Sequence, residues 1–552
     1  MYSNLVKRIF LLLTISISLI PKAGACTSII VGKKASVDGS AFITYNQDDY
    51  GMFGRLRYFA PGTHPAGTMR PIIDGDTNRP LGSIPEAPYT YAVMGYINEH
   101  QVGITETTFG GREELHDTTG IIDYTSLMHI ALQRSRTARE AIDVMTSLVE
   151  KYGYASEGES FSIVDPNEVW ILEMIGKGGK ERGAVWVAVR IPDDCIACHA
   201  NQSRIHRFDM KDKENVRYAK DVITFARKQG YFTGKDMDFS FAEAYAPADF
   251  GAIRFCEARV WSFFNRWVEG MERYIDYADG HHIGRAEVMP LYFKPKHKLS
   301  LADVMTSMRD HYEGTPFDVS TDIGAGPYGA PYRPTPLTWE WEGKTYFNER
   351  PISTQQTAAT FILQVRSNLP APVGGIVWFG NDEPNMVPYT PVYCCATAAP
   401  ACYDPSEADD VTFSWNSAFW VQNWVANMTY PRYSQLFPDV LKVREQIEHN
   451  LLAQQSLIEK QALTLYKEDP KQAADFLTKY SNRVAAGMLQ EWKRLGEFLI
   501  VKYNDQTIKH ETNRHFERDE YGLAKRPVRT GFDSQYRQRI VKETGNRYLL
   551  PQ

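Results

Sequence analysis

The chain has 552 residues with 61 basic and 67 acidic side chains, which gives a formal net charge of −6. Neither sign gathers in one block, so nucleic acid and anionic membrane surfaces are poor candidate partners. The length allows a large buried core but does not fix the number of domains.

The first predicted element is a secretory signal peptide over residues 1–25. Two basic residues precede an apolar run from Ile9 to Ile20, and Ala23-Gly24-Ala25 follow. This order is that of a secretory signal, and the run is too short to span a bilayer. We therefore expect an exported chain, periplasmic or secreted, without stable membrane insertion. Cleavage after Ala25 would make Cys26 its first residue.

Two other interpretations of Cys26 stay open at this point. The Ala-Gly-Ala-Cys sequence resembles a lipoprotein cleavage box, which would anchor the chain at the cell surface through a lipid, although such boxes usually carry Leu where Ala23 stands. Cys26 could instead form a disulfide. An odd number of cysteines leaves one unpaired in an oxidising compartment, and the pairing of the other six cannot be deduced: Cys195, Cys198, Cys256, Cys394, Cys395 and Cys402.

The elements that follow begin with a β-hairpin and a helix. Two apolar runs flank Asp38-Gly39, a pattern that predicts a hairpin and places Cys26 at the start of a strand. At Thr137 a capping box opens a segment with apolar side chains at helical spacing, and Gly153 ends it. We expect a helix of about four turns there.

Further strands and a long helical segment are predicted downstream. Strands before and after a helix indicate an α+β layered domain and not βαβ repeats. Helical periodicity runs from about Tyr433 to Lys502, and a polar stretch from Asn504 onward reads as an extended arm. The predicted strands are FSIV from Phe161, VWILEMI from Val169, AVWVAVRI from Ala184, ATFILQV from Ala359 and GGIVWFG from Gly374.

A cysteine at a free amino terminus carries a thiol and an α-amine on one residue. The ordinary pKa of an α-amine is about 7.7 to 8.0, so the amine can accept a proton near neutral pH. Because the thiolate is the reactive form, this built-in base makes a nucleophile for acyl transfer without a histidine. A carboxylate, an arginine or asparagine and backbone donors would complete the site.

Five segments occur in order along the chain: CTSIIVGKKASVDGS, YNQDDYG, NEHQVGITETT, HANQSRI and HYEGTPFDVSTDIGAGPYGAPYR. Together they resemble the bacterial dipeptidase A family of cysteine-type N-terminal nucleophile hydrolases. The resemblance implies a four-layer αββα sandwich and hydrolysis of dipeptides. No cofactor or metal is expected, since a zinc site would need a second ligand pair and none stands at a suitable spacing. The resemblance divides the chain into a signal peptide over 1–25, a catalytic domain over 26–430, and a helical C-terminal region with a polar tail over 431–552.

The resemblance also implies roles for individual residues. Cys26 matches the nucleophile, and Asp48 matches a carboxylate beside the nucleophile and its amine. Asn201 matches an oxyanion-binding or amine-binding asparagine, and Arg259 is a candidate late active-site arginine. Related choloylglycine-type hydrolases carry an arginine three residues before the aspartate, where this chain has Tyr45.

Glu106, Thr107 and Thr108 are candidates for lining the substrate pocket. Structural explanations compete with several of these assignments. Asp48 could belong to an ordinary acidic turn, and Arg259 could pair with a carboxylate across a helix. Glu106 could be a buried, hydrogen-bonded group, and the Asn201 segment is also a glycosylation sequon.

Two further motifs carry little weight. Cys195 to His199 fits the haem-attachment pattern C-x-x-C-H, but it runs into the HANQSRI segment, so a local disulfide or two free thiols are expected. Residues 324–329 read G-x-G-x-x-G without a strand before or a helix after them, which excludes a dinucleotide site. Another amide hydrolase of the same fold, such as a penicillin or bile-salt acylase, is the main alternative to a dipeptidase. Assembly into a homo-oligomer stays open.

Overall fold

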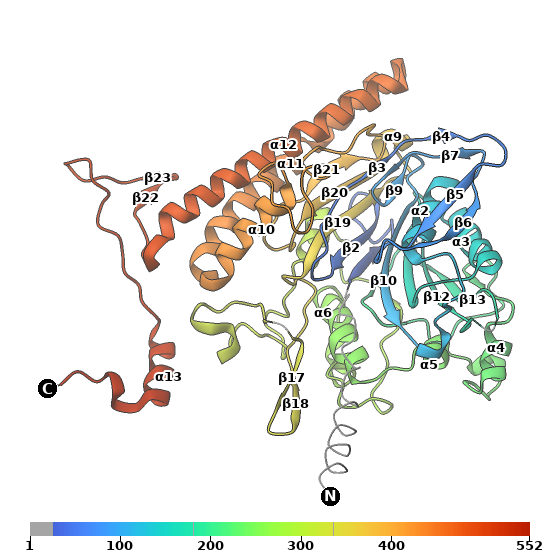
Figure 1. Cartoon of the computed structure of the whole chain (residues 1–552), viewed down its shortest axis with the longest axis horizontal. Helices are drawn as coiled ribbons and strands as arrows, with labels where there is room; N and C mark the ends of the chain where they lie inside the picture. The colour runs from blue at the N-terminus through green and yellow to red at the C-terminus, as the bar shows by residue number, and fades with distance from the viewer. Residues whose placement is uncertain (1–25, 180, 335, 552) are drawn as a thin grey trace, which may run out of the picture.

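A computed structural model describes residues 26–179, 181–334 and 336–551 of the chain. The predicted signal peptide therefore lies outside the described residues. No helix in the described part has the length and apolar character that a membrane span requires. The chain combines two large antiparallel sheets with helices, including long C-terminal ones, so its mixed helix and strand composition agrees with the prediction (Figure 1).

The predicted hairpin after Cys26 is confirmed. Strand β1 (Ser28–Val31) pairs antiparallel with β2 (Ala41–Asp48), with Ile30 opposite Ile43. The turn between them places Gly39 at a φ of 79°, in the left-handed region that favours glycine. Cys26 thus directly precedes a central strand of a sheet.

The strands of the two large sheets all pair antiparallel. The first sheet has the order β16 (Tyr292–Phe293), β14 (Ile196–His199), β1, β2, β19 (Thr357–Val365), β20 (Ile376–Asn381) and β21 (Thr390–Tyr393). The second has the order β15 (Val216–Tyr218), β13 (Ala184–Ile191), β12 (Val169–Gly176), β11 (Gly158–Val164), β10 (Gly103–Gly110), β9 (Ile97–Asn98), β8 (Val93–Met94) and β3 (Tyr58–Phe59). The five strands predicted from Phe161, Val169, Ala184, Ala359 and Gly374 are all present.

Alternation along the strands sends side chains into three apolar clusters. One cluster contains residues of both sheets, among them Ile43 of β2 and Ile171 of β12, and Cys26 belongs to it. Ile29 and Phe42 join a second cluster with the helices after residue 250. Ile104 and Trp170 join a third cluster with helices α2 (Tyr124–Arg134) and α3 (Ala138–Tyr152). Because successive strand residues point to opposite faces, each large sheet carries apolar side chains on both faces.

The predicted helix after Thr137 is α3. The Thr137 hydroxyl accepts the Glu140 backbone N–H over 3.1 Å, and Gly153 ends the helix at a φ of 78°. The Glu140 carboxylate accepts the Arg136 backbone N–H and not that of Thr137, so the reciprocal half of the capping box is shifted by one residue.

Seven further α-helices complete this part of the described chain. Two short ones follow β15, and the other five lie after residue 250. They are α4 (Val222–Gln229), α5 (Phe241–Tyr245), α6 (Ala258–Trp267), α7 (Ile275–Ala278), α8 (Leu301–Ser307), α9 (Ala371–Gly374) and α10 (Ala418–Thr429). Small hairpins join β4 (Gly62–Thr63) to β7 (Tyr89–Thr90), β5 (Met69–Ile73) to β6 (Pro80–Pro85), and β17 (Thr338–Trp341) to β18 (Lys344–Phe347).

The predicted C-terminal helical segment consists of α11 (Tyr433–Glu468) and α12 (Pro470–Tyr503). The break falls at Asp469, whose side chain accepts the Lys471 N–H and caps α12, with Pro470 at the first helical position. Figure 1 shows α12 lying along the edge of the first sheet near β21. Both helices add buried side chains to the clusters of the sheets, whereas the boundary at residue 430 stays a prediction.

The stretch after Asn504 is more structured than an extended arm. It forms a short hairpin of β22 (Glu511–Thr512) and β23 (His515–Phe516) and the helix α13 (Ser534–Thr544), none of whose residues is buried. In Figure 1 this stretch runs away from the sheets.

Candidate active site

Cys26 lies at the entrance to β1 with 9% of its surface exposed. Its thiol donates to the Tyr45 hydroxyl oxygen over 3.6 Å. Burial raises the pKa of the Cys26 thiol well above its ordinary value, and the carboxyl groups of Glu106 and Asp48 raise it further. The sulfur is therefore held in its neutral form by its surroundings.

Arg259 connects the segments around Cys26. It is fully buried on α6, directly after one turn of π-helix over Ala252–Glu257, a local widening that often occurs at functional sites. Its guanidinium donates to five acceptors, namely the backbone oxygen of Cys26 (2.6 Å), Thr27 Oγ1 (2.8 Å), the backbone oxygen of Ala200 (3.0 Å), Asn201 Oδ1 (2.9 Å) and the backbone oxygen of Phe255 (2.6 Å). The structure thus brings the three predicted residues Cys26, Asn201 and Arg259 together.

Asn201 follows β14 in a left-handed backbone conformation with a φ of 62°. Asparagine tolerates this region better than most residues, and such conformations gather at functional sites. Its Oδ1 accepts from Arg259, and its Nδ2 donates to the backbone oxygen of Thr108 over 2.7 Å. An amide nitrogen carries two hydrogens, so one hydrogen is left for a further acceptor.

Asp48 ends β2 and is buried. Its carboxylate pairs with the Arg350 guanidinium and accepts from Thr357 Oγ1 over 2.5 Å. Burial raises the pKa of Asp48, and the positive charge of Arg350 opposes that shift. The acidic-turn explanation does not describe this carboxyl, since it lies on a strand and in an ion pair.

A buried polar network joins the strand of Cys26 to the second sheet. Ser28 Oγ lies 3.1 Å from Thr105 Oγ1 and 3.0 Å from Ser162 Oγ. His199 bonds Thr107 through Nδ1 and Ser162 through Nε2, each at 2.7 Å. Burial lowers the pKa of His199 to about 3, so the imidazole is neutral at physiological pH. His199 therefore links β14 of the first sheet to β10 and β11 of the second.

The three predicted pocket residues occupy different places. Glu106 has 1% of its surface exposed and accepts the Tyr45 hydroxyl hydrogen. Thr107 is fully buried against His199, and Thr108 offers its backbone oxygen to Asn201. Their role in substrate binding stays a prediction.

Two cavities bear on where a ligand could bind. The smaller, of about 240 Å³, is lined by Tyr45 and Gln47 of β2 together with Tyr96, Asp76 and other residues of the second sheet and its loops. Tyr45 lies between this cavity and the Cys26 sulfur, because its hydroxyl contacts the thiol.

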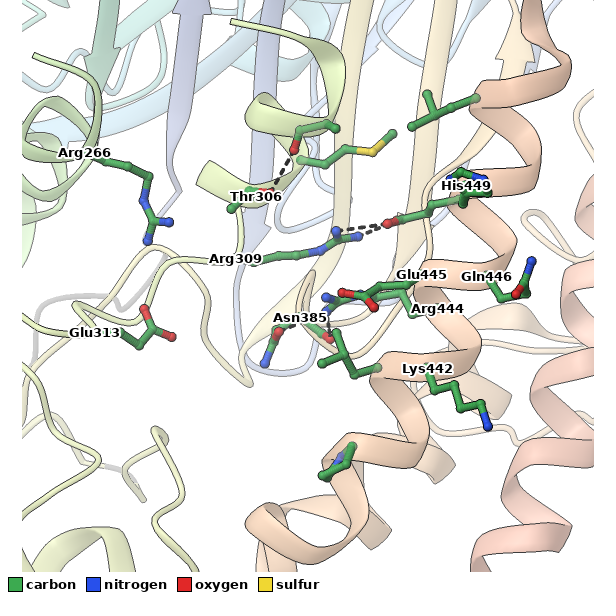
Figure 2. A pocket seen from close by; sticks show the side chains of 16 residues that line it. Arg266, Thr306, Arg309, Glu313, Asn385, Lys442, Arg444, Glu445, Gln446 and His449 are labelled. Carbon is green, nitrogen blue, oxygen red and sulfur yellow. Dashed lines mark hydrogen bonds and ion pairs between the residues drawn. The ribbon is translucent and has the colours of Figure 1, made fainter. Parts of the chain in front are cut away.

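The larger cavity, of about 1000 Å³, lies elsewhere. Figure 2 shows it between the segment that carries Thr306 and Arg309 and the helix that carries Glu445 and His449. Arg309 forms an ion pair with Glu448 across this cavity. Its lining contains none of the predicted catalytic residues. Cavity size alone therefore does not identify the reactive site.

Sequence reasoning missed Arg350 and gave Tyr45 no role. Arg350 lies 302 residues after Asp48, outside every recognised segment, so no local pattern signals the pair. Tyr45 was visible only as a departure from the arginine that related hydrolases carry. Its contact with the sulfur becomes apparent only when β1 and β2 are placed side by side.

The cysteine chemistry of the described chain is simple. All seven cysteines are free, including Cys195 directly before β14 and Cys198 within it, so of the two expected outcomes the structure has free thiols. Cys195 packs in the cluster between the sheets and Cys198 in the cluster with α6, so their side chains point to opposite faces. One group of ligand-type side chains, Asp276, Asp279 and His282, lies together among the described residues and shares no member with the site.

A buried thiol with a carboxylate, an amide and a guanidinium around it is the set of groups that a cysteine-type amide hydrolase requires. The family model of Peptidase family C69 matches residues 25–61 and 62–446, most of the chain, and the chain belongs to this family.

Curated relatives agree with this assignment. The chain is 27% identical to "Probable dipeptidase" of Salmonella dublin over 392 residues, which cover 67% of this chain and 81% of the relative. It is 26% identical to "Dipeptidase A" of Lactobacillus helveticus over 438 residues, 75% of this chain and 83% of the relative. It is 24% identical to "Probable dipeptidase B" of Lactococcus lactis subsp. lactis over 518 residues, 89% of this chain and 98% of the relative.

Proposed function

We propose that this chain is an exported dipeptidase whose nucleophile is Cys26, made the first residue by cleavage after Ala25. The names of the similar proteins support dipeptides as the substrate class. The observation that carries the assignment of the nucleophile is the environment of Cys26, whose carbonyl oxygen is held by Arg259 and whose sulfur contacts Tyr45. The family match also begins at residue 25, next to this cysteine.

A thiol in this environment needs a base close to it. Burial and two neighbouring carboxyl groups raise the pKa of the Cys26 thiol, which disfavours the thiolate. A free α-amine on the same residue would take the thiol proton and, as an ammonium, stabilise the thiolate. His199 cannot serve as that base, because burial lowers its pKa to about 3 and both ring nitrogens are engaged.

The proposed reaction proceeds through a thioester. The Cys26 sulfur attacks the peptide carbonyl carbon, its proton passes to the α-amine, and the carbonyl π pair moves to the oxygen. The second amide hydrogen of Asn201 and backbone donors stabilise that oxyanion. The C–N bond then breaks and the leaving amine takes the proton from the α-ammonium. Water hydrolyses the thioester by the same proton transfers and frees the sulfur.

The cavity beside Tyr45 is the proposed position of the substrate. Its volume of about 240 Å³ is a little below the roughly 300–1,000 Å³ of sites for drug-sized ligands, which suits a small peptide. Asp76 in its lining offers a carboxylate and Arg57 a guanidinium, the charges that would attract the two free ends of a dipeptide.

The finer architecture belongs to the same proposal. We infer a four-layer αββα sandwich with the two large sheets as its inner layers. The apolar cluster shared by both sheets and the separate clusters between each sheet and its helices support this arrangement.

Three measurements test the proposed function. Amino-terminal sequencing and intact mass of the exported protein should give a free cysteine at the first position with no added lipid. A panel of dipeptides and N-acyl amides should show hydrolysis of dipeptides, and Cys26→Ala should abolish it. Preferential hydrolysis of N-acyl amides would favour an acylase, and dipeptide hydrolysis by a chain still peptide-linked at Cys26 would contradict the proposed nucleophile.

A further inference from the structure

The sulfur of Cys26 is the first member of a chain of buried hydrogen bonds. The thiol donates to Tyr45 Oη, and the Tyr45 hydroxyl donates to Glu106 Oε1. Tyr45 is 2% exposed and Glu106 is 1% exposed. The tyrosine stands where related hydrolases carry an arginine, so a neutral hydroxyl and a carboxyl replace a permanent positive charge beside the nucleophile.

A second carboxyl lies behind Glu106. Strands β10 and β11 place Thr108 opposite Glu159, so Glu106, two residues earlier on β10, projects from the same face as Glu159. Glu106 Oε2 and Glu159 Oε2 are both buried without a hydrogen-bond partner among the described residues, and Thr108 Oγ1 donates to Glu159 Oε1 over 2.7 Å. Two neighbouring buried carboxyl groups hold one proton between them, because two adjacent charges in a buried site repel each other.

The shared proton is retained near neutral pH. Burial raises the pKa of Glu106 to about 7, and burial together with the Glu106 charge raises the pKa of Glu159 well above its ordinary value. Two further carboxylates act in the same direction, Asp76 from the loop between β5 and β6 on Glu106 and Glu157 from the segment before β11 on Glu159. The phenols that face the pair are Tyr96 between β8 and β9, Tyr124 of α2 and Tyr154 after α3.

The charge of Glu106 decides which way the Tyr45 hydroxyl points. When Glu106 is a carboxylate, the hydroxyl donates to it, and the thiol must donate to the hydroxyl oxygen to complete the chain. When Glu106 is protonated, it can donate to Tyr45, and the hydroxyl hydrogen is free to turn toward a thiolate. The first arrangement keeps the sulfur neutral, and the second stabilises its reactive form.

We propose that the Glu106–Glu159 pair acts through Tyr45 as a proton-controlled switch on the reactivity of the Cys26 thiol. A charged Glu106 keeps the sulfur neutral and unreactive, and a neutral Glu106 stabilises the reactive thiolate. This inference rests on the proposed function of Cys26 as the nucleophile. Glu106 and Glu159 are positioning residues, since each has 1% of its surface exposed and neither lines the 240 Å³ cavity. Tyr45 lines that cavity and transmits the charge state to the sulfur.

The test measures the reactivity of the Cys26 thiol and not peptide hydrolysis. The mature protein is alkylated with iodoacetamide from about pH 5 to pH 9, and modification of Cys26 is followed by peptide mass. In Glu106→Gln the amide keeps the hydrogen bonds but never carries the charge. Above neutral pH we expect this variant to react roughly tenfold faster than the unaltered protein, because the nearby negative charge that raises the pKa of the thiol is gone.

Tyr45→Phe provides a second, independent variant. It keeps the edge-to-face contacts of the ring with Tyr96 and Phe361, so the packing is retained. Because the charge state of Glu106 reaches the sulfur through the Tyr45 hydroxyl, loss of that hydroxyl should flatten the pH step in Cys26 reactivity. A purely structural role of Tyr45 would change the rate by one factor at every pH and leave the step in place.

Glu173→Gln is the matched control. Glu173 is also fully buried, burial raises its pKa to about 7, and it is held by Ser203 and the backbone of Arg204. The carboxyl groups that raise the Cys26 pKa most are those of Glu106 and Asp48, so the Glu173 variant should keep the pH profile of the unaltered protein.

The outcomes separate the switch from the proposed function. An unchanged alkylation profile in folded Glu106→Gln, or an equal change in Glu173→Gln, would overturn the switch. Dipeptide hydrolysis that persists in Cys26→Ala would instead overturn the nucleophile assignment. Loss of hydrolysis in Cys26→Ala with unaltered profiles in Glu106→Gln and Tyr45→Phe would remove the switch and leave the dipeptidase proposal intact.

Discussion

Replacing Arg259 by lysine tests whether this arginine organises the reactive site. Arg259 uses all five of its N–H groups on buried acceptors, and a lysine ammonium has three donors. At least two of those acceptors therefore lose their partner. A hydrogen bond to a charged group contributes about 1.5–3 kcal/mol, so Arg259→Lys should lower the free energy of unfolding by about 3–6 kcal/mol.

The effect on catalysis should exceed the effect of destabilisation alone. Arg259 holds both the carbonyl of Cys26 and the side chain of Asn201, and misplacement of reacting groups by about 1 Å can reduce the rate about 10²-fold. We expect kcat/KM for a dipeptide to fall by about this factor in folded Arg259→Lys. Urea unfolding measures the stability, and circular dichroism at the assay temperature checks that the variant is folded.

Arg309→Lys is the matched control for this experiment. Arg309 is a buried arginine of the larger cavity, and it donates to Glu448 and to the backbone oxygens of Pro384 and Val387. Its variant should lose stability for the same reason and keep its kcat/KM. The reasoning fails if Arg259→Lys unfolds at the same urea concentration as the unaltered protein, or if both variants lose activity equally.

Three further predictions address other parts of the site. Asn201→Gly removes the amide while keeping the backbone at a φ of 62° without strain, and kcat/KM should fall roughly 10²–10³-fold, since one oxyanion donor is lost; unchanged kcat/KM in a folded variant would exclude Asn201 from catalysis. Burial lowers the pKa of His199 to about 3, whereas its ordinary value is about 6.5. The free energy of unfolding should therefore be at its full value above about pH 6.5 and should fall as the pH drops below about 6.5, by up to about 1.4 kcal/mol per pH unit. Urea unfolding between about pH 7 and pH 4 should show a shallower loss for His199→Gln, and equal slopes would contradict this account. Thiol titration of the unfolded mature protein without reductant should count seven thiols, and a lower count would reveal a disulfide that the structure lacks.

Local patterns determined the elements that carry the site. The alternating runs around Asp38-Gly39 predicted the hairpin, and Thr137 with Gly153 fixed both ends of α3. These predictions succeed because hairpin turns and helix caps depend on residues within a few positions of each other. The family segments likewise named Cys26 and Asn201, and the same resemblance made Arg259 a candidate from outside those segments; the structure brings all three into one hydrogen-bonded group.

Contacts between distant strands were decided by the tertiary structure alone. The ion pair of Asp48 with Arg350 and the chain from Cys26 through Tyr45 to Glu106 each join segments that no spacing in the sequence relates. The pKa shifts follow from the same cause, because desolvation depends on which atoms surround a group and not on its neighbours in sequence. The sequence thus determined which residues are chemically able to react, and the packing of the two sheets decided which of them meet and in what charge state.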